Sequence, residues 1–225
     1  MFNKKVGIIL GIVVLAIFLL IIFFPKASFC REKFHTIFIK KSSEIKGTKS
    51  TPIFIIDNFL SDTECNNLIS SCKNDLIESP LTRFQENFRT SETCHFSDKD
   101  IQVHIENKIT KLLNLDDQKT EKAQIQYYKI GKEFKPHYDY FDPEVDPEYL
   151  VNGQRSWTIM IYLNNVEEGG CTYFPELKEE IRPKKGRLVG WCNLDKQGQM
   201  DKNTLHQGLP VIKGEKWILT KWFLI

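Results

Sequence analysis

The chain has 225 residues, of which 41% are hydrophobic and 27% charged, and its formal net charge at pH 7 is +2. A chain of this length suits one domain with a sizeable core, and the small net charge argues against a nucleic-acid partner, which would need clustered positive charge. The six cysteines show no CxxC spacing, which argues against a zinc ribbon.

The N-terminus contains a continuous apolar run, Val6–Phe24, without a charged residue. About 20 apolar residues span a bilayer as a helix, whereas the core of a secretory signal has roughly 7–15 residues. No small-residue cleavage site follows Phe24. We therefore expect residues 1–26 to form an uncleaved signal-anchor, which would make the chain a single-pass membrane protein.

The charges that flank this run leave its orientation open. Lys4 and Lys5 precede the run, but more lysines and arginines follow it, which by charge alone favours a cytosolic domain. An N-terminal anchor followed by one domain nevertheless commonly places that domain in the lumen. We expect a lumenal domain in the endoplasmic reticulum, with the cytosolic orientation as the alternative, and one or two disulfides if the domain is lumenal.

The segment after the anchor, residues 27–50, is rich in Lys, Ser and Thr and is expected to be a tether, which leaves residues 51–225 for the domain. The domain should begin with a buried strand at Pro52–Ile56. A capping box at Ser61–Glu64 predicts a helix to about Lys73. A second box-like start at Ser97–Asp100, followed by apolar residues at helical spacing, predicts another helix.

After Asp116 the hydrophobic pattern changes from helical to alternating, and glycines between the apolar segments fit turns. The short, aromatic-rich and β-branched segments predict strands at Gln124–Ile130, Arg155–Leu163, Cys171–Phe174, Arg187–Cys192 and Lys216–Leu224. The predicted fold class is therefore mainly β with flanking α-helices, and the strands suit a double-sheet roll.

A candidate metal site lies in this strand-rich half. His137 and Asp139 are two residues apart, so on a strand their side chains would leave the same face and reach one ion. His206 is placed to supply a second imidazole. Two histidines and one carboxylate form the facial triad of non-haem Fe(II) oxygenases, with positions free for a co-substrate and oxygen. An H-x-D pair alone is more often an ordinary hydrogen-bonded pair, and zinc also accepts these ligands, so a hydrolytic zinc enzyme is an alternative.

The last predicted strand carries a lysine that fits the oxygenase interpretation. Lys216, Ile218, Thr220 and Trp222 alternate onto one face, so a cation and an indole point to the same side. Beside a metal, a lysine ammonium is a natural partner for the far carboxylate of a bound diacid. Considered alone, Lys216 would more simply be a solvated lysine at a strand edge.

Three segments together closely resemble the catalytic domain of prolyl 4-hydroxylases: Tyr128–Tyr140 (YKIGKEFKPHYDY), Arg155–Pro175 (RSWTIMIYLNNVEEGGCTYFP) and His206–Trp222 (HQGLPVIKGEKWILTKW). The segments FLSDTECNNLI at Phe59–Ile69 and FRTS at Phe88–Ser91 are similar to the N-terminal half of that domain. The resemblance covers roughly residues 52–225, and it is to the short, membrane-anchored members of the family.

The resemblance implies a 2-oxoglutarate- and Fe(II)-dependent dioxygenase on a double-stranded β-helix, or jelly-roll, core. The catalytic iron would be held by His137, Asp139 and His206. The remaining residues implied to bind the co-substrate are Lys216 at the far carboxylate, Tyr128 and Thr172 sharing that carboxylate through their hydroxyls, and Trp222 lining the pocket.

The implied reaction uses O2 to form 4-hydroxyproline in a peptide and releases succinate and CO2, with ascorbate as the expected reductant. Arg155 matches a family arginine that faces the peptide, and Tyr140 is a candidate wall of the substrate groove. A surface role for Arg155 and a core role for Tyr140 are the alternatives, because fold-level analogy transfers substrate contacts poorly. The expected partner is a proline-rich peptide or protein, which would bind extended on aromatic surfaces.

The sequence departs from many relatives just before the first histidine, where Lys129, Lys132, Glu133 and Phe134 replace a small-residue turn and a tyrosine. The sequence therefore does not determine which substrate side chain is hydroxylated. The same oxygenase chemistry on peptidyl lysine or another side chain is one alternative, and a non-catalytic, membrane-tethered binding module is another. The oligomeric state does not follow from the sequence.

Overall fold

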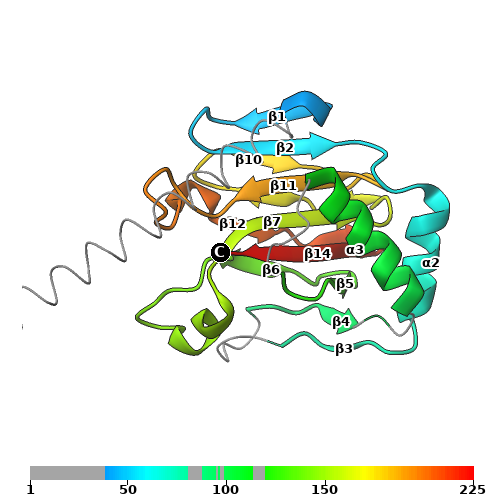
Figure 1. Cartoon of the computed structure of the whole chain (residues 1–225). Helices are drawn as coiled ribbons and strands as arrows, with labels where there is room; N and C mark the ends of the chain where they lie inside the picture. Colours follow the sequence, from blue (N-terminus) through cyan, green and yellow to red (C-terminus); the bar gives the residue numbers. More distant parts are fainter. Residues whose placement is uncertain (1–38, 81–87, 95, 97–98, 114–119) are drawn as a thin grey trace, which may run out of the picture.

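The computed structural model describes residues 39–80, 88–94, 96, 99–113 and 120–225, whose main elements are two facing antiparallel sheets and two longer α-helices (Figure 1). No helix within these ranges is long and apolar enough to cross a membrane. The predicted anchor, residues 1–26, and the first part of the predicted tether lie outside the described residues.

The larger sheet has eight strands among the described residues, in the order β1-β2-β11-β7-β14-β5-β4-β3. These strands are β1 (Glu44–Gly47), β2 (Pro52–Ile56), β3 (Ile77–Glu78), β4 (Glu92–Cys94), β5 (Gln124–Tyr128), β7 (Arg155–Tyr162), β11 (Leu188–Cys192) and β14 (Lys216–Leu224). Strands β2, β5, β7, β11 and β14 match predicted segments. Strand β1 is a correction: the sequence placed it in the tether, but its backbone pairs antiparallel with β2 along all four residues.

The two helices, α2 (Asp62–Cys72) and α3 (Lys99–Leu113), cover one face of this sheet (Figure 1). The predicted capping box starts α2, because Ser61 Oγ accepts from the Glu64 amide and Glu64 accepts from the Ser61 amide. The box-like start predicted for α3 lies partly outside the described residues. A disulfide joins Cys72 at the end of α2 to Cys94 in β4. Apolar helix residues pack against one face of the central strands, in a cluster that includes Leu68, Ile105, Ile109, Trp157, Leu219 and Phe223.

The opposite face of the large sheet packs against a smaller sheet in the order β10-β9-β12-β6. Its strands are β6 (Phe134–His137), β9 (Thr172–Phe174), β10 (Glu179–Ile181) and β12 (His206–Gly208). A further pair, β8 (Glu168–Gly169) with β13 (Val211–Lys213), and two short 3-10 helices, η1 (Pro147–Asn152) and η2 (Lys202–Thr204), complete the described elements. The double-sheet roll is therefore as predicted.

All nine residues of β14 are buried, because both faces of this strand are covered. Trp217, Leu219 and Phe223 point into the core under the helices. Lys216 and Trp222 belong to the other face, where they line a pocket between the sheets with Ile218 and Thr220. Alternation along the strand thus directs one set of side chains to the core and the other to the candidate site.

Candidate metal centre and co-substrate pocket

The candidate metal ligands meet where two neighbouring strands of the smaller sheet pair. His137 ends β6 and His206 begins β12, and the antiparallel register places the two residues directly opposite each other. The sequence predicted that Asp139 lies on the same strand as His137. It lies instead in the bend that follows β6. The bend still returns its side chain to the same side, so that three potential ligands converge although 67 residues separate Asp139 from His206.

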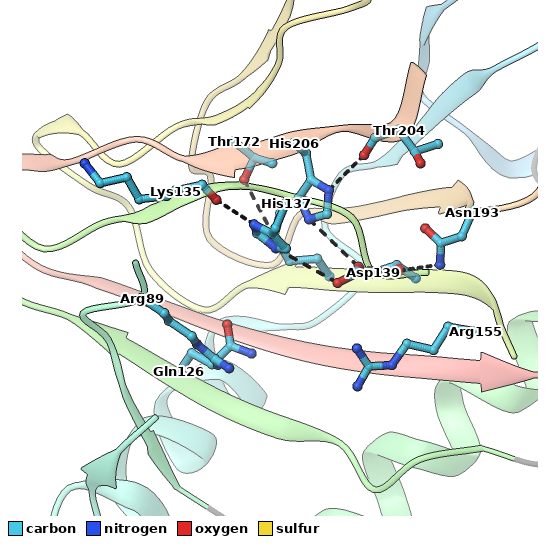
Figure 2. Close-up of polar contacts among 12 residues, drawn as sticks. Arg89, Gln126, Lys135, His137, Asp139, Arg155, Thr172, Asn193, Thr204 and His206 are labelled. Carbon is cyan, nitrogen blue, oxygen red and sulfur yellow. Dashed lines mark hydrogen bonds and ion pairs between the residues drawn. The ribbon is translucent and has the colours of Figure 1, made fainter. Parts of the chain in front are cut away.

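The three side chains are arranged around a common point (Figure 2). His137 Nε2 lies 4.0 Å from Asp139 Oδ1, and His206 Nε2 lies 3.8 Å from Asp139 Oδ2. One donor atom from each residue can be chosen so that all lie within 4.8 Å of one another. These separations and the two-histidine, one-carboxylate donor set fit a mononuclear Fe(II) ion.

Neighbouring groups orient the ligands for this role. His137 Nδ1 donates to the Lys135 carbonyl at 2.7 Å, and His206 Nδ1 donates to the Thr204 carbonyl at 3.0 Å, which leaves both Nε2 atoms available to a metal. The Thr158 hydroxyl donates to Asp139 Oδ2 at 2.7 Å. Such outer contacts hold tautomer and ring orientation in metal sites. The fit therefore extends beyond the ligands themselves.

The protonation of the ligands also suits metal binding. Burial, followed by the adjacent His206, lowers the pKa of His137 to about 3, so its imidazole is neutral at physiological pH. Burial alone would raise the pKa of Asp139, but His206, His137 and the Thr158 hydrogen bond lower it to about 2. A neutral imidazole and an ionised carboxylate are the forms that coordinate metal ions.

Lys216 lies in the adjoining pocket rather than at a solvated strand edge. Its side chain is 1% exposed, and burial lowers the pKa of its ammonium to about 8. The Nζ atom lies 5.0 Å from the centre of the Tyr128 ring and 5.8 Å from that of Tyr162. No carboxylate of the described residues lies within ion-pair distance of this nitrogen. A diacid co-substrate bound at the metal would supply the carboxylate partner that this buried ammonium lacks.

The other predicted co-substrate residues line the same pocket. Tyr128 faces Lys216 across the β5–β14 pairing. The Thr172 hydroxyl accepts a hydrogen bond from Tyr162 at 2.7 Å. Trp222 lines the pocket and also borders a larger cavity. The structure therefore brings all four predicted residues, Lys216 included, into one space.

The larger cavity, of about 600 Å³, adjoins the metal ligands and includes both residues predicted to face a peptide. Arg155 is held there by a bidentate ion pair to Glu121, with nitrogen–oxygen distances of 2.5 and 2.7 Å. Its guanidinium carbon lies 3.9 Å from the centre of the Trp222 ring. Tyr140 is half-buried, lines the cavity and also packs against the main core.

Several residues at the site were not predicted. Glu121 fixes Arg155, and Thr158 fixes Asp139. Arg89, from the FRTS segment, lines both cavities and donates to Ser91 Oγ at 3.0 Å. Gln126 lines the smaller pocket. Alternation along β5 could have indicated Gln126, because it shares a face with Tyr128, but no local pattern connects Arg89 or Glu121 to the metal centre.

Comparison with known proteins places this arrangement in a family. Residues 123–224 match the model of the 2OG-Fe(II) oxygenase superfamily. Prolyl 4-hydroxylase 2 of Arabidopsis thaliana is 33% identical over 210 residues, which cover 80% of this chain and 70% of that protein. Probable prolyl 4-hydroxylase 7 of the same plant is 32% identical over 196 residues, which cover 76% of this chain but only 61% of that protein.

Solved structures agree with this relationship. The viral collagen prolyl hydroxylase from Paramecium Bursaria Chlorella virus-1, in a 2OG complex, has a TM-score of 0.62 and 36% identity over 76% of this chain and 94% of that one. A prolyl hydroxylase from Trichoplax adhaerens, in complex with a hypoxia inducible factor peptide fragment, shares the fold, with a TM-score of 0.60 at 17% identity over 89% of this chain and 91% of that one. The chain therefore belongs to the prolyl 4-hydroxylase family of 2-oxoglutarate- and Fe(II)-dependent oxygenases.

Proposed function

We propose that this protein hydroxylates C4 of proline residues in peptides or proteins, using Fe(II), 2-oxoglutarate and O2. One observation carries the proposal: His137, Asp139 and His206 converge beside a pocket whose only described lysine, Lys216, is buried and has no carboxylate partner. Each turnover would convert one C–H bond to C–OH while 2-oxoglutarate and O2 become succinate and CO2. Ascorbate is the expected reductant, as is typical of the family.

The chain's own residues have distinct tasks in this reaction. The triad would hold iron, and Lys216, with the hydroxyls of Tyr128 and Thr172, would hold the far carboxylate of 2-oxoglutarate. When bound, iron and 2-oxoglutarate supply the oxidation, while the protein supplies position and electrostatics. The walls of the pocket are mainly buried side chains, which keep bulk water away from the reacting atoms.

The larger cavity would receive the peptide. Its aromatic residues include Tyr140, Phe141, Tyr149 and Trp222. Polyproline II segments have no internal hydrogen bonds and bind to aromatic-lined grooves, which suits a proline-rich substrate. Arg155 would act from its fixed position against Glu121 and Trp222, because the ion pair restricts the guanidinium to one side of the cavity.

The test is a mass-spectrometric assay of the full chain with proline-rich peptides and matched peptides in which lysine replaces proline. We expect proline peptides to gain one oxygen atom, with an equal amount of succinate, only when Fe(II), 2-oxoglutarate and O2 are all present. Asp139→Asn should abolish both products, because the amide supplies no anionic ligand. Oxygen gain on lysine peptides alone would contradict the proline assignment, and succinate-free or metal-independent turnover would contradict the oxygenase.

We also propose that residues 1–26 anchor this domain in the endoplasmic reticulum membrane, with the connection ending before β1 and the domain from β1 onward in the lumen. The apolar run Val6–Phe24 supports an anchor. The Cys72–Cys94 disulfide supports the lumenal side, because disulfides persist in oxidising compartments. Protease digestion of intact microsomes tests this orientation: a lumenal domain is protected until detergent is added, and a cytosolic domain is not.

A further inference from the structure

Strand β5 presents a buried glutamine to the co-substrate pocket. Gln126 is 4% exposed and lines the pocket together with Lys216. Figure 2 shows its side chain beside that of Arg89, which lines the same pocket. Its Oε1 accepts a hydrogen bond from the Tyr128 hydroxyl at 3.4 Å. Its Nε2 donates no hydrogen bond to any residue that the structure describes. Buried amide groups normally have hydrogen-bond partners, since an unmade bond there is costly.

The register of the large sheet gives the position of Gln126 along the pocket, relative to Lys216. Strand β14 pairs Lys216 with Tyr128 and Ile218 with Gln126. Successive side chains on the same face of a strand are about 6.6 Å apart. Gln126 therefore lies one such step along the pocket from the level of the ammonium, a distance comparable to the length of a five-carbon diacid.

The metal centre lies in the same direction. On the other side of β14, Trp222 pairs with Thr158, and Thr158 is the residue whose hydroxyl binds Asp139. Thr158 thus marks the direction of the metal centre along β14.

On the facing strand β12, an added Cβ at Gly208 would lie 3.4 Å from Lys216 Nζ, and His206 is two residues from Gly208. The ammonium therefore lies about one same-face step from the level of a metal ligand. Gln126 lines this same pocket, so its amide lies beside the space that a diacid between the ammonium and the metal would occupy.

We propose that Gln126 is a positioning residue for the co-substrate, and that its Nε2 donates a hydrogen bond to an oxygen of bound 2-oxoglutarate. Carboxylate and keto oxygens only accept hydrogen bonds, and a glutamine nitrogen only donates them, so the two groups are complementary. The role rests on the proposed oxygenase function for the identity of the diacid. It does not depend on which side chain of the substrate is hydroxylated.

The test measures 2-oxoglutarate binding by the full chain, loaded with Mn(II) in place of iron, by titration calorimetry without peptide. Loss of the donor in Gln126→Leu should raise the Kd about three- to tenfold, the range expected for the net contribution of one ordinary hydrogen bond. Gln126→Glu keeps the shape but places a carboxylate beside the diacid, and it should raise the Kd by more than tenfold.

Gln124→Glu is the matched control, because Gln124 lies on the same face of β5, one step further from Lys216, and lines the larger cavity instead. Its 2-oxoglutarate Kd should stay within about twofold of the wild-type value, because Gln124 is not among the residues that line the co-substrate pocket. The Tm of each variant is measured alongside, because a buried carboxylate lowers stability, and Gln126→Leu provides the answer if Gln126→Glu does not fold.

Two results would overturn the inference. One is a wild-type Kd in both Gln126 variants, and the other is an equal rise for Gln124→Glu and Gln126→Glu, which would indicate only a general effect of added charge. Failure of the proposed function has a different signature. In that case proline peptides gain no oxygen, while 2-oxoglutarate still binds and its Kd still depends on Gln126.

Discussion

At the scale of single residues, the buried ammonium of Lys216 lowers the stability of the folded protein but strengthens the binding of a diacid. Burial of an ammonium without a carboxylate partner is unfavourable, which is why its pKa falls to about 8. A bound diacid restores the missing opposite charge. The same burial that destabilises the charged lysine therefore strengthens its interaction with the ligand, because little water screens the pair.

This coupling predicts that 2-oxoglutarate affinity depends on pH around the pKa of Lys216. A diacid favours the charged lysine, so its binding raises that pKa above about 8. Affinity should be constant below pH 8 and fall by about tenfold per pH unit well above it. At pH 8, calorimetry in two buffers of different ionisation enthalpy should detect proton uptake on binding.

The groups that face Lys216 do not titrate in this window. Burial raises the pKa values of Tyr128, Tyr162 and Cys171, the last to about 11. Lys216→Met is the control, since it removes the titrating group with little change in volume. This variant should bind 2-oxoglutarate more weakly and without the decline above pH 8. A wild-type affinity that does not change between pH 7 and 9.5 would show that the ammonium does not bind the diacid.

At the scale of elements, tight turns between short strands hold the pocket walls in place. Gly169 has φ +75°, and a Cβ at this position would collide with the Pro210 carbonyl oxygen in the paired strand region. The next residue, Gly170, has φ +68°, and an added Cβ would lie 3.4 Å from Lys216 Cδ, in contact with the lysine stem. The two glycines thus allow β8 to approach β13 and allow the chain to pass beside the lysine stem.

We predict that Gly169→Ala lowers the free energy of unfolding by about 3 kcal/mol, the sum of a left-handed backbone penalty and a steric clash. Gly131→Ala is the matched control, because Gly131 has φ +76° but nothing within 4 Å of an added Cβ. This control should lose only about 1 kcal/mol, from the backbone penalty alone. Urea unfolding measures both values, and equal losses would show that the contact with Pro210 is not what requires glycine.

At the scale of the whole molecule, the sequence predicted those parts that local patterns determine. The strands β2, β5, β7, β11 and β14 and both helices follow from alternation, helical spacing and capping. His137 and Asp139 were predicted because the H-x-D spacing is local, whereas His206 had to be added from a distant segment as the second imidazole. The sequence alone does not contain the register that places His206 opposite His137. That register depends on how distant strands pair.

The errors have the same physical origin. Strand β1 was assigned to the tether because its sequence is polar, and it is a strand only because β2 offers an edge to pair with. Asp139 was placed on a strand, whereas the backbone bends directly after His137. Arg89 and Glu121 reach the site from segments without a recognisable local pattern. Tertiary contacts determine all of these features.

The disulfide Cys72–Cys94 connects helix α2 to strand β4, next to the edge strand β3 of the large sheet, and it gives a prediction for the whole fold. The cysteines are 22 residues apart, and the cross-link restricts the unfolded chain. Closing a loop of this length is worth about 3 kcal/mol in the chain-entropy model. In urea unfolding, reductant should therefore lower the free energy of unfolding by about 3 kcal/mol.

Cys65→Ala provides the control for this comparison, because Cys65 is a buried free cysteine in the same helix and packs in the same core. This variant should lose some stability through its cavity but keep the full response to reductant. The metal ligands and Lys216 lie on the opposite face of the large sheet, so reduction should leave the 2-oxoglutarate Kd unchanged. If reduction left the wild-type unfolding free energy unchanged, the cross-link would not contribute to the stability of the fold.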